Sequence, residues 1–466
     1  MTFETLAIFG GAPVRAKPFS VGPMVDNEEE ELVLAAIREH NFSRYIGSTS
    51  PDIDTILAMP STEAGELDVD WHFLGGPNVR KFAAEFAARF ETPYAIPVNS
   101  ATSGLSTALA AAGVGAGDEV ILPALSFSAS GSAVLLFNSI PVFVDVDPKT
   151  FCIDPAAIKA AITPRTKAIM PVHLLGNACD MTAIMEIAKR HNLKVIEDCA
   201  QGPGVRYQDQ PVGTIGDAGV FSFQQSKNIM TGEGGMIITD DPEIARKARL
   251  VLNHGETVME DHHDIEELSN VVGCNFRMPE LSAALGRAQL KKLDTVNNWR
   301  NDNYRILARE LGDLPGLTAP YIPQDVAYVS HVAAFLYDAE ETGLPRDLLI
   351  AAIRAEGIPM GTGYVRLMYE NQTFLKKIAF GSSGSPWTDG ESQSTVTYAC
   401  GQCPVAEALI YEKFLWLYHI AHPSTADDMN DIIAAIKKVL ENSEQILARA
   451  DEIRGTGKGA RSQGRI

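Results

Sequence analysis

The stretch GDAGVFSFQQSKNIMTGEGGMIIT (216–239) contains two apolar, β-rich runs, Gly219–Phe223 and Gly235–Thr239, and both are expected to be strands. Lys227 follows the first run and precedes a glycine cluster that lets the backbone come close to a ligand. A lysine in this position could be a Schiff-base nucleophile. Taken alone, it is better explained as a solvated loop lysine, because charged side chains are mostly exposed.

Similar apolar runs precede this stretch and alternate with helix-like segments. The expected strands are Glu119–Pro123, Pro141–Val146, Ala168–Val172 and Lys194–Asp198, and the expected helices are Ser128–Asn138, Asp154–Ile162 and Met181–His191. This alternation predicts right-handed crossovers and a mostly parallel sheet that is buried on both faces. The fold is therefore expected to be α/β, with a ligand beyond the carboxyl ends of the strands.

Two further segments suit a ligand at that edge. Asp198 ends a buried strand, so its carboxylate requires either a cationic partner or a satisfied hydrogen-bond network; helix capping is the alternative. The segment NSATSGL (99–105) opens an apolar helix, where hydroxyls and backbone amides could bind a phosphate or simply cap the helix. A lysine, an aspartate for a pyridinium nitrogen and a phosphate site together indicate pyridoxal phosphate.

With these motifs, the chain resembles the DegT/DnrJ/EryC1/StrS group of sugar aminotransferases from about residue 9 to residue 439. The motifs that carry the resemblance are GGAPVR (10–15), NSATSGL (99–105), GDEVILPALSFSAS (117–130), PVFVDVDPKTFCID (141–154), PVHLLG (171–176), EDCAQ (197–201), GDAGVFSFQQSK (216–227), GEGG (232–235) and GCNFRMPELSAALGRAQL (273–290). QQSK before GEGG is most similar to the branch that acts on keto-inositols, such as glutamine:scyllo-inosose aminotransferases. Two positions depart from the family pattern, Cys274 in place of a tyrosine and Ala101 in place of a glycine.

The resemblance implies the fold of pyridoxal-phosphate-dependent transferases of fold type I, with a large and a small domain. We expect an N-terminal segment with a helix and a long loop (1–90), a large cofactor-binding α/β domain (91–295), a smaller α+β domain (296–450) and a flexible tail (451–466). Glu280–Leu311 is expected to be helical, as are Arg346–Glu356 and Thr425–Leu447, and a strand is expected at Val332–Asp338.

The resemblance also implies roles around the cofactor ring. Lys227 would form the Schiff base and then move a proton, and Asp198 would keep the pyridine nitrogen protonated. Gln201 would lie beside the ring or its 3-hydroxyl, and Phe127 would stack on the ring face.

The remaining implied roles concern the phosphate, the substrates and a second subunit. Thr102, the backbone at Ser103, and Ser222 would bind the phosphate. Asn275 would reach the phosphate of the other subunit, which implies a homodimer with shared active sites. Arg277 would bind the donor carboxylate or the substrate, and His331 is a further substrate-binding candidate. The donor would be L-glutamate or L-glutamine and the acceptor a keto-sugar or keto-cyclitol.

Composition excludes several other classes of protein. Lys and Arg total 39 against 59 Asp and Glu, a formal charge of −20, which argues against a nucleic-acid or acidic-membrane partner. No apolar run approaches the roughly 18 residues of a membrane helix, and the start lacks a secretory signal, so a cytoplasmic location is expected. Cys400 and Cys403 have metal-ligand spacing, but no second pair accompanies them, so no metal is expected.

Two alternatives to an aminotransferase are open from the sequence. Deoxysugar dehydratases of the same fold replace the lysine, typically with histidine, whereas Lys227 is present. A non-catalytic, cofactor-binding regulator would normally need a DNA-binding module, and neither a basic helix–turn–helix nor spare length is visible.

Overall fold

The computed structural model describes residues 5–46, 53–255, 271–364, 366–388 and 394–455. Its largest sheet has seven strands in the order β1-β9-β8-β5-β4-β2-β3. Their bounds are Tyr94–Val98 (β1), Glu119–Pro123 (β2), Ile140–Val144 (β3), Thr166–Ile169 (β4), Lys194–Asp198 (β5), Ala218–Ser222 (β8) and Gly235–Thr239 (β9). The pairs β2–β3, β2–β4, β4–β5 and β5–β8 are parallel, and β9 runs antiparallel to β8 and β1. The prediction of an α/β fold with a mostly parallel sheet is confirmed.

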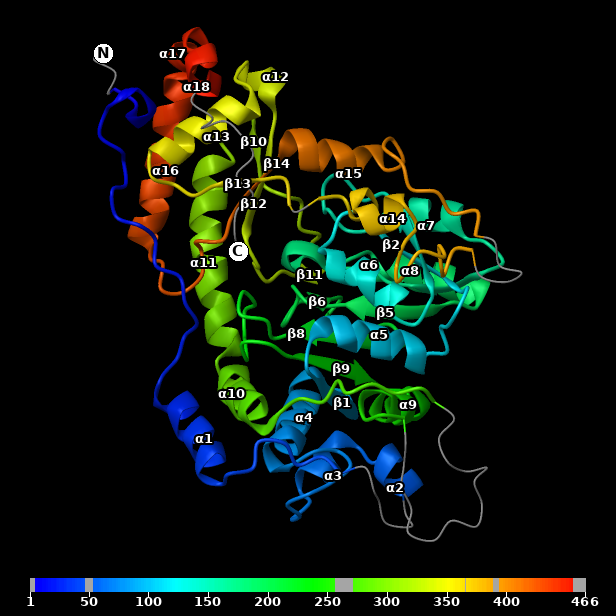
Figure 1. Ribbon diagram of the computed structural model, residues 1–466. Coiled ribbons are helices and arrows are strands. Elements are labelled where there is room, and N and C mark those ends of the chain that lie inside the picture. Colours follow the sequence, from blue (N-terminus) through cyan, green and yellow to red (C-terminus); the bar gives the residue numbers. More distant parts are fainter. Residues whose placement is uncertain (1–4, 47–52, 256–270, 365, 389–393, 456–466) are drawn as a thin grey trace.

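Helices cover this sheet, whose strands are almost entirely buried (Figure 1). The helices are α4 (Pro77–Phe90), α5 (Ala101–Ala111), α6 (Ser128–Leu135), α7 (Pro155–Ala161), α8 (Met181–His191) and α9 (Pro242–Leu252). Helices α5, α6 and α9 pack in one row, with α5 against both neighbours, while α7 packs against α8. The apolar strand runs are thus enclosed by helices, which is why they lack the alternation of half-exposed strands.

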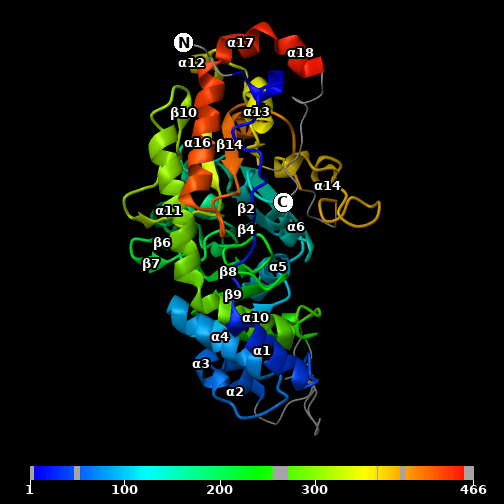
Figure 2. The same ribbon diagram turned by 90° about the vertical axis from the view of Figure 1, so that its left-hand side faces the viewer.

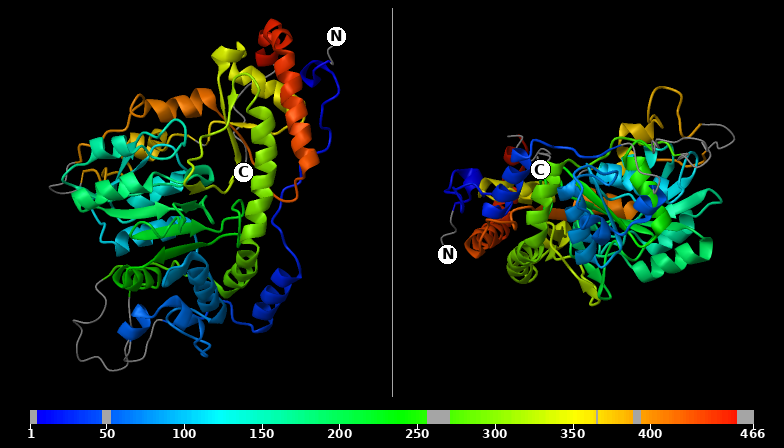
Figure 3. Two further views of the ribbon diagram at one scale, coloured as in Figure 1. Left: turned by 180° about the vertical axis from the view of Figure 1, so that it is seen from behind. Right: turned by 90° about the horizontal axis from the view of Figure 1, so that it is seen from below.

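A second, antiparallel sheet has its own hydrophobic core. Its strands, in the order β10-β12-β14-β13, are Leu317–Thr318, Ala333–Tyr337, Phe414–Leu417 and Gly361–Thr362. Helices α11 (Leu293–Leu311), α13 (Arg346–Ala355) and α16 (Ala426–Glu441) pack beside it, and Figure 2 shows α11 and α16 running side by side. The N-terminal segment runs along this second unit (Figure 3), and its Leu6 is buried in the second core. The Glu356 carboxylate holds the segment there by accepting hydrogen bonds from the backbone amides of Ala7 and Val14.

Several predicted elements have slightly different bounds in the structure, and three predictions differ from it in kind. The helix expected over 280–311 is two helices, α10 (Glu280–Lys291) and α11, which meet at Lys292. The helix expected over 425–447 divides at Asn442 into α16 and α17 (Ser443–Ala448). The N-terminal segment, where a long loop was expected, also contains α2 (Ile53–Ala58) and α3 (Ser61–Gly65), and residues 47–52 lie outside the described residues.

The start of the expected tail is helical. Further helices and strands complete the described chain. Residues 456–466 of the tail lie outside the described residues, whereas its first residues belong to α18 (Ala450–Gly455). The other elements are η1 (Ala7–Phe9), α1 (Asn27–Arg38), η2 (Leu174–Gly176), β6 (Arg206–Tyr207), β7 (Gln210–Pro211), β11 (Val326–Ala327), α12 (Ala339–Thr342), η4 (Met368–Glu370), α14 (Gln372–Leu375), α15 (Pro404–Ala408) and η5 (Leu409–Lys413). None of the described helices combines the length and the apolarity needed to cross a membrane.

Candidate active site

A cavity of ≈ 1270 Å³ opens where the strands of the large sheet end and the second sheet approaches them. The large sheet contributes residues that follow β1 and β2 and residues at the ends of β5 and β8. The second unit contributes residues 331, 346 and 362–364. Ligands on sheets of this type bind at the carboxyl ends of the strands. Seven of the residues predicted from the sequence line this one cavity: Thr102, Phe127, Asp198, Gln201, Ser222, Lys227 and His331.

Asp198 is a buried carboxylate that has only neutral hydrogen-bond donors. Its Oδ2 accepts from Ser130 Oγ at 2.8 Å and its Oδ1 accepts from the Ala200 amide at 3.1 Å. It forms no ion pair within the described residues, although it is only 4% exposed. Burial raises the pKa of Asp198, and the bonds from Ser130 and Ala200 oppose this effect in part. A cationic ring nitrogen in the cavity would complete the set of partners that the carboxylate needs.

Lys227 lies in the connection between β8 and β9, where its backbone amide donates to the Gln224 carbonyl at 2.8 Å. Its side chain lines the cavity and, within the described part of the chain, Nζ forms no hydrogen bond or ion pair. Burial lowers the pKa of Lys227 to about 8; the Asp198 carboxylate raises this pKa and the Arg300 guanidinium lowers it. An appreciable fraction of the amine is therefore neutral near pH 8, as a nucleophile requires.

The start of α5 forms the part of the cavity that suits a phosphate. Ala101 and Thr102 line the cavity in the first helical turn, where backbone amides lack partners within the helix. Ser222, at the end of β8, lines the cavity as well. Ser103 does not line it, and its amide already donates to Ser100 Oγ at 3.2 Å in a helix cap. Gly235, the first residue of β9, allows this strand to lie against the start of α5, since a Cβ at this position would lie 2.8 Å from the Ala101 nitrogen.

Phe127 and Gln201 provide an aromatic face and a fixed amide. Phe127 is 48% exposed although it lines the cavity, so its ring is available to a planar ligand. Gln201 Oε1 accepts from the Leu175 amide at 2.8 Å, and Gln201 Nε2 donates to Tyr364 Oη at 2.7 Å. These two bonds determine which end of the amide faces which neighbour. The sequence did not single out Tyr364, whose position depends on how the second sheet packs.

Asn275 and Arg277, two further predicted residues, also lie outside this chain's cavity. Asn275 is exposed, and its Oδ1 accepts from Arg277 Nε at 2.9 Å. Arg277 Nη1 also donates to Asn253 Oδ1 at 3.2 Å, and neither residue lines the cavity. A role for Asn275 and Arg277 in this chain's own site is therefore not supported by the geometry.

Two histidines have different environments. His331 lines the cavity, its backbone amide donates to the Leu175 carbonyl at 3.2 Å, and its Nδ1 is buried without a partner among the described residues. His173 instead donates from Nε2 to Glu197 Oε2 at 2.9 Å, because its Nδ1 accepts from the Cys179 amide. With Cys199, His173 and Glu197 form the one group of described residues with metal-ligand spacing. The Glu197 carboxylate is already saturated, since it also accepts from the amides of residues 213, 215 and 216.

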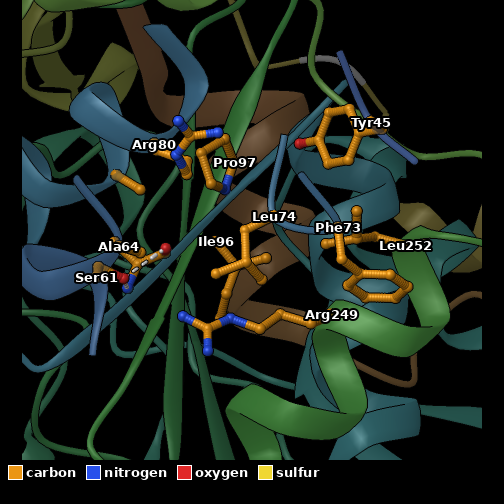
Figure 4. Close-up of a pocket in the computed structure, with 12 residues that line it drawn as sticks. Tyr45, Ser61, Ala64, Phe73, Leu74, Arg80, Ile96, Pro97, Arg249 and Leu252 are labelled. Atoms are coloured by element: carbon orange, nitrogen blue, oxygen red, sulfur yellow. Dashed lines mark hydrogen bonds between the residues drawn. The ribbon is translucent and has the colours of Figure 1, made fainter. Parts of the chain in front are cut away.

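Figure 4 shows a second, much smaller cavity of ≈ 20 Å³, which has room for about one water molecule. Arg80 and Arg249 line it, and none of the predicted site residues does. Arg249 donates to the Leu57 carbonyl at 2.6 Å and lies over the Tyr94 ring at 5.6 Å. This cavity is too small for a cofactor, and its polar groups serve to join α2 and α9.

Comparisons with known proteins give a consistent result. The model of the DegT/DnrJ/EryC1/StrS aminotransferase family matches residues 64–402. An L-glutamine:2-deoxy-scyllo-inosose aminotransferase of Streptoalloteichus tenebrarius is 34% identical over 95% of this chain and 99% of its own length. An enzyme of the same name from Micromonospora echinospora is 37% identical over 79% of this chain and 87% of its own length. The X-ray structure of an aminotransferase from Psychrobacter cryohalolentis is 29% identical, with a TM-score of 0.75 over 92% of this chain and all of the other.

Proposed function

The chain belongs to the DegT/DnrJ/EryC1/StrS aminotransferase family, and from this premise we propose that it transfers the amino group of L-glutamine to a keto-cyclitol or a related keto-sugar, with pyridoxal phosphate as its cofactor. As a member of the family it is an aminotransferase with the fold of the pyridoxal-phosphate-dependent transferases of fold type I. The observation that carries the proposal is that Lys227 and Asp198 line the same large cavity. Neither side chain forms an ion pair within the described chain.

Each group of the cofactor has a counterpart among the cavity residues. The first turn of α5 with Thr102 and Ser222 suits the phosphate, Phe127 suits the ring face, and Asp198 suits the ring nitrogen. Pyridoxal phosphate, when bound, supplies an electron sink for the negative charge that develops on the amino-acid carbon. The chain's own contribution is to hold the ring nitrogen protonated through Asp198 and to accept and return a proton at Lys227 Nζ.

Part of the cavity lining supports a polyhydroxylated acceptor. Glu370 and Tyr411 are hydrogen-bonded to each other there, and Gln372 lies in the same wall. The Arg346 guanidinium is occupied within the chain, because it donates hydrogen bonds to the backbone carbonyls of Ile410 and Phe414. Carboxylate, phenol and amide groups are suited to ring hydroxyls. The relatives from Streptoalloteichus and Micromonospora are named for glutamine and a keto-cyclitol, which supports the same pair of substrates for this chain.

We further propose that the enzyme is a homodimer in which Asn275 serves the partner's site. Asn275 is exposed on its own chain and lies outside the cavity of that chain, as expected for a residue that reaches across an interface. Arg277 fixes the Asn275 side chain through the 2.9 Å bond to Oδ1. Within the described parts of the chain, the Asn275 amide nitrogen has no acceptor, so it is available to donate to an anion.

Reduction with borohydride, combined with a donor screen, tests the proposal. Full-length protein incubated with pyridoxal phosphate and then reduced should carry the cofactor covalently on the peptide that contains Lys227. Before reduction, L-glutamine should change the visible absorption of the bound cofactor, and a keto-cyclitol should reverse the change. Lys227→Arg is the matched control, since it keeps the positive charge and cannot be labelled. Labelling of another lysine, or a spectrum that no amino donor changes, would overturn the proposal.

A further inference from the structure

The two residues beside Lys227 are held from behind by the second sheet and α11. Tyr418, which follows β14, donates from Oη to the Ser226 carbonyl at 2.7 Å. Asn228 Nδ2 donates to Asn297 Oδ1 of α11 at 2.8 Å. Lys227 is therefore fixed on both sides by residues that are distant in sequence. Asn297 belongs to α11, so this helix runs past the segment that contains Lys227.

Arg300 lies in α11, about one helical turn after Asn297, and is 3% exposed. Its Nη1 donates to the His331 carbonyl at 2.7 Å, and its guanidinium lies over the Tyr418 ring at 5.4 Å. Arg300 Nε has no hydrogen-bond partner and, within the described residues, no carboxylate pairs with the guanidinium. A buried cation without a counter-ion is costly, so this placement calls for an explanation.

We propose that Arg300 is a positioning residue for Lys227: its buried, unpaired guanidinium places a positive charge behind the lysine and favours the neutral, nucleophilic amine. A neighbouring cation is an established way to activate a lysine nucleophile. Arg300 does not touch the reacting atoms in this role, and it acts through Lys227. The inference rests on the proposed function of Lys227, and it assigns a function to a residue that sequence motifs do not mark.

The other charges around Lys227 limit the size of the effect. Burial is the main cause that lowers the pKa of Lys227 to about 8; Asp198 on β5 opposes it, and Arg300 on α11 adds to it. His331 stays neutral, because burial and the charges of Lys227 and Arg300 hold its pKa well below the usual range. The remaining charged residues of the cavity wall are Glu233, Arg346, Arg366 and Glu370. Removal of the Arg300 charge should therefore raise the pKa of Lys227 without restoring its solution value.

Competitive acetylation of the cofactor-free, full-length protein measures the pKa of Lys227 directly. The rate at which the Lys227 peptide is labelled, followed by mass spectrometry from pH 6 to pH 11, gives the pKa of its amine. Arg300→Gln removes the charge and retains a donor for the His331 carbonyl, whereas Arg300→Lys retains both charge and donor. We expect the pKa to rise by about one unit in Arg300→Gln, about a tenfold loss of neutral amine at pH 7. In Arg300→Lys it should stay near the wild-type value.

Arg249→Met is the matched control, because Arg249 is also buried at 4% exposure and also lacks a carboxylate partner in the described chain. It lies in the small cavity away from Lys227, so its loss should leave the labelling profile unchanged. An unchanged Lys227 pKa in Arg300→Gln, or an equal shift in Arg249→Met, would overturn the inference. If Arg300→Gln does not fold, Arg300→Met and Arg300→Lys provide the same comparison of charge.

The labelling contains no cofactor, so it separates this inference from the proposed function. Borohydride attachment at a lysine other than Lys227 would contradict the function while the pKa shift still held. Attachment at Lys227 with no effect of Arg300→Gln would contradict only the inference.

Discussion

At the scale of single residues, two adjacent carboxylates on β5 have opposite environments. Side chains alternate between the faces of a strand, so Glu197 and Asp198 point away from each other. Glu197 accepts three backbone amides and His173 Nε2, all within 2.9 Å. Among the described residues, the Asp198 carboxylate has two hydrogen-bond donors, and it faces the cavity. The first carboxylate is thus committed to the fold, whereas the second has capacity left for a ligand.

Asp198→Asn should bind pyridoxal phosphate within about tenfold of wild type and lose catalysis by about 100-fold or more. The amide is nearly isosteric with the carboxylate, but it cannot keep a ring nitrogen protonated, so the developing negative charge is no longer stabilised. A fluorescence titration measures cofactor binding, and kcat with glutamine and a keto-cyclitol measures the chemistry. Near-wild-type kcat in this variant would rule out the role given to Asp198.

Glu197→Gln should lower the free energy of unfolding by about 3 kcal/mol without any direct effect on the cavity. Each carboxylate oxygen of Glu197 accepts hydrogen bonds from two donors, so in either orientation the amide NH2 group of the glutamine faces two donors and cannot accept from them. Urea denaturation measures the loss. Glu243→Gln, at an exposed position on α9, is the control and should change stability by less than about 0.5 kcal/mol. Equal stabilities of the two variants would contradict the role of Glu197 in stabilising the fold.

At the scale of elements, the sequence predicted the buried strands well because their apolar runs are a local property. It did not predict β1, an edge strand that contains Pro97, since proline argues against a central strand. The division at Lys292 was also missed. Lys292 pairs with Asp26 and Glu29, which are distant in sequence, so no local signal marks the point where α10 ends.

The same distinction applies to the candidate site. Lys227 and Asp198 could be selected because each follows or ends a strand, and the carboxyl ends of parallel strands meet at one edge. Arg300 and Tyr364 could not, because tertiary packing alone brings Tyr364 to the cavity and Arg300 of α11 to the His331 carbonyl. Asn275 lies outside the cavity of its own chain, so its predicted role depends on a second subunit.

The contact between η2 and the segment that precedes β12 provides a prediction for elements. Gly176 has a φ of +89°, and a Cβ there would lie 1.6 Å from the Val329 carbonyl oxygen. Gly176→Ala should therefore separate the two sheets at His331 and destabilise the protein by about 3 kcal/mol or more. Gly113→Ala is the control, with a φ of +85° and nothing within 4 Å, and should cost only about 1 kcal/mol. Similar unfolding midpoints in urea for the two variants would show that the close contact is not required.

At the scale of the whole molecule, the cavity is open between two sheets while Asn275 lies on the exposed surface of its own chain. A shared site in a two-fold dimer reconciles the two observations, since each chain would then lend Asn275 to the other. If Asn275 contacts the partner's phosphate, Asn275→Asp places a negative charge against a dianion and should release the cofactor. Lys227→Ala should be inactive for a different reason, the loss of the amine that binds the cofactor and moves the proton. Each variant alone should therefore have almost no activity.

Mixing these two variants tests whether the site is shared. After subunit exchange by mild unfolding, half of the dimers are mixed, and in a mixed dimer both defects fall into one site while the other site is intact. Random pairing then predicts about a quarter of wild-type activity. If Asn275 acted within its own chain, every site would keep one defect and no activity would return. Native mass spectrometry must show the mixed dimer, because only then does an inactive mixture count against the shared site.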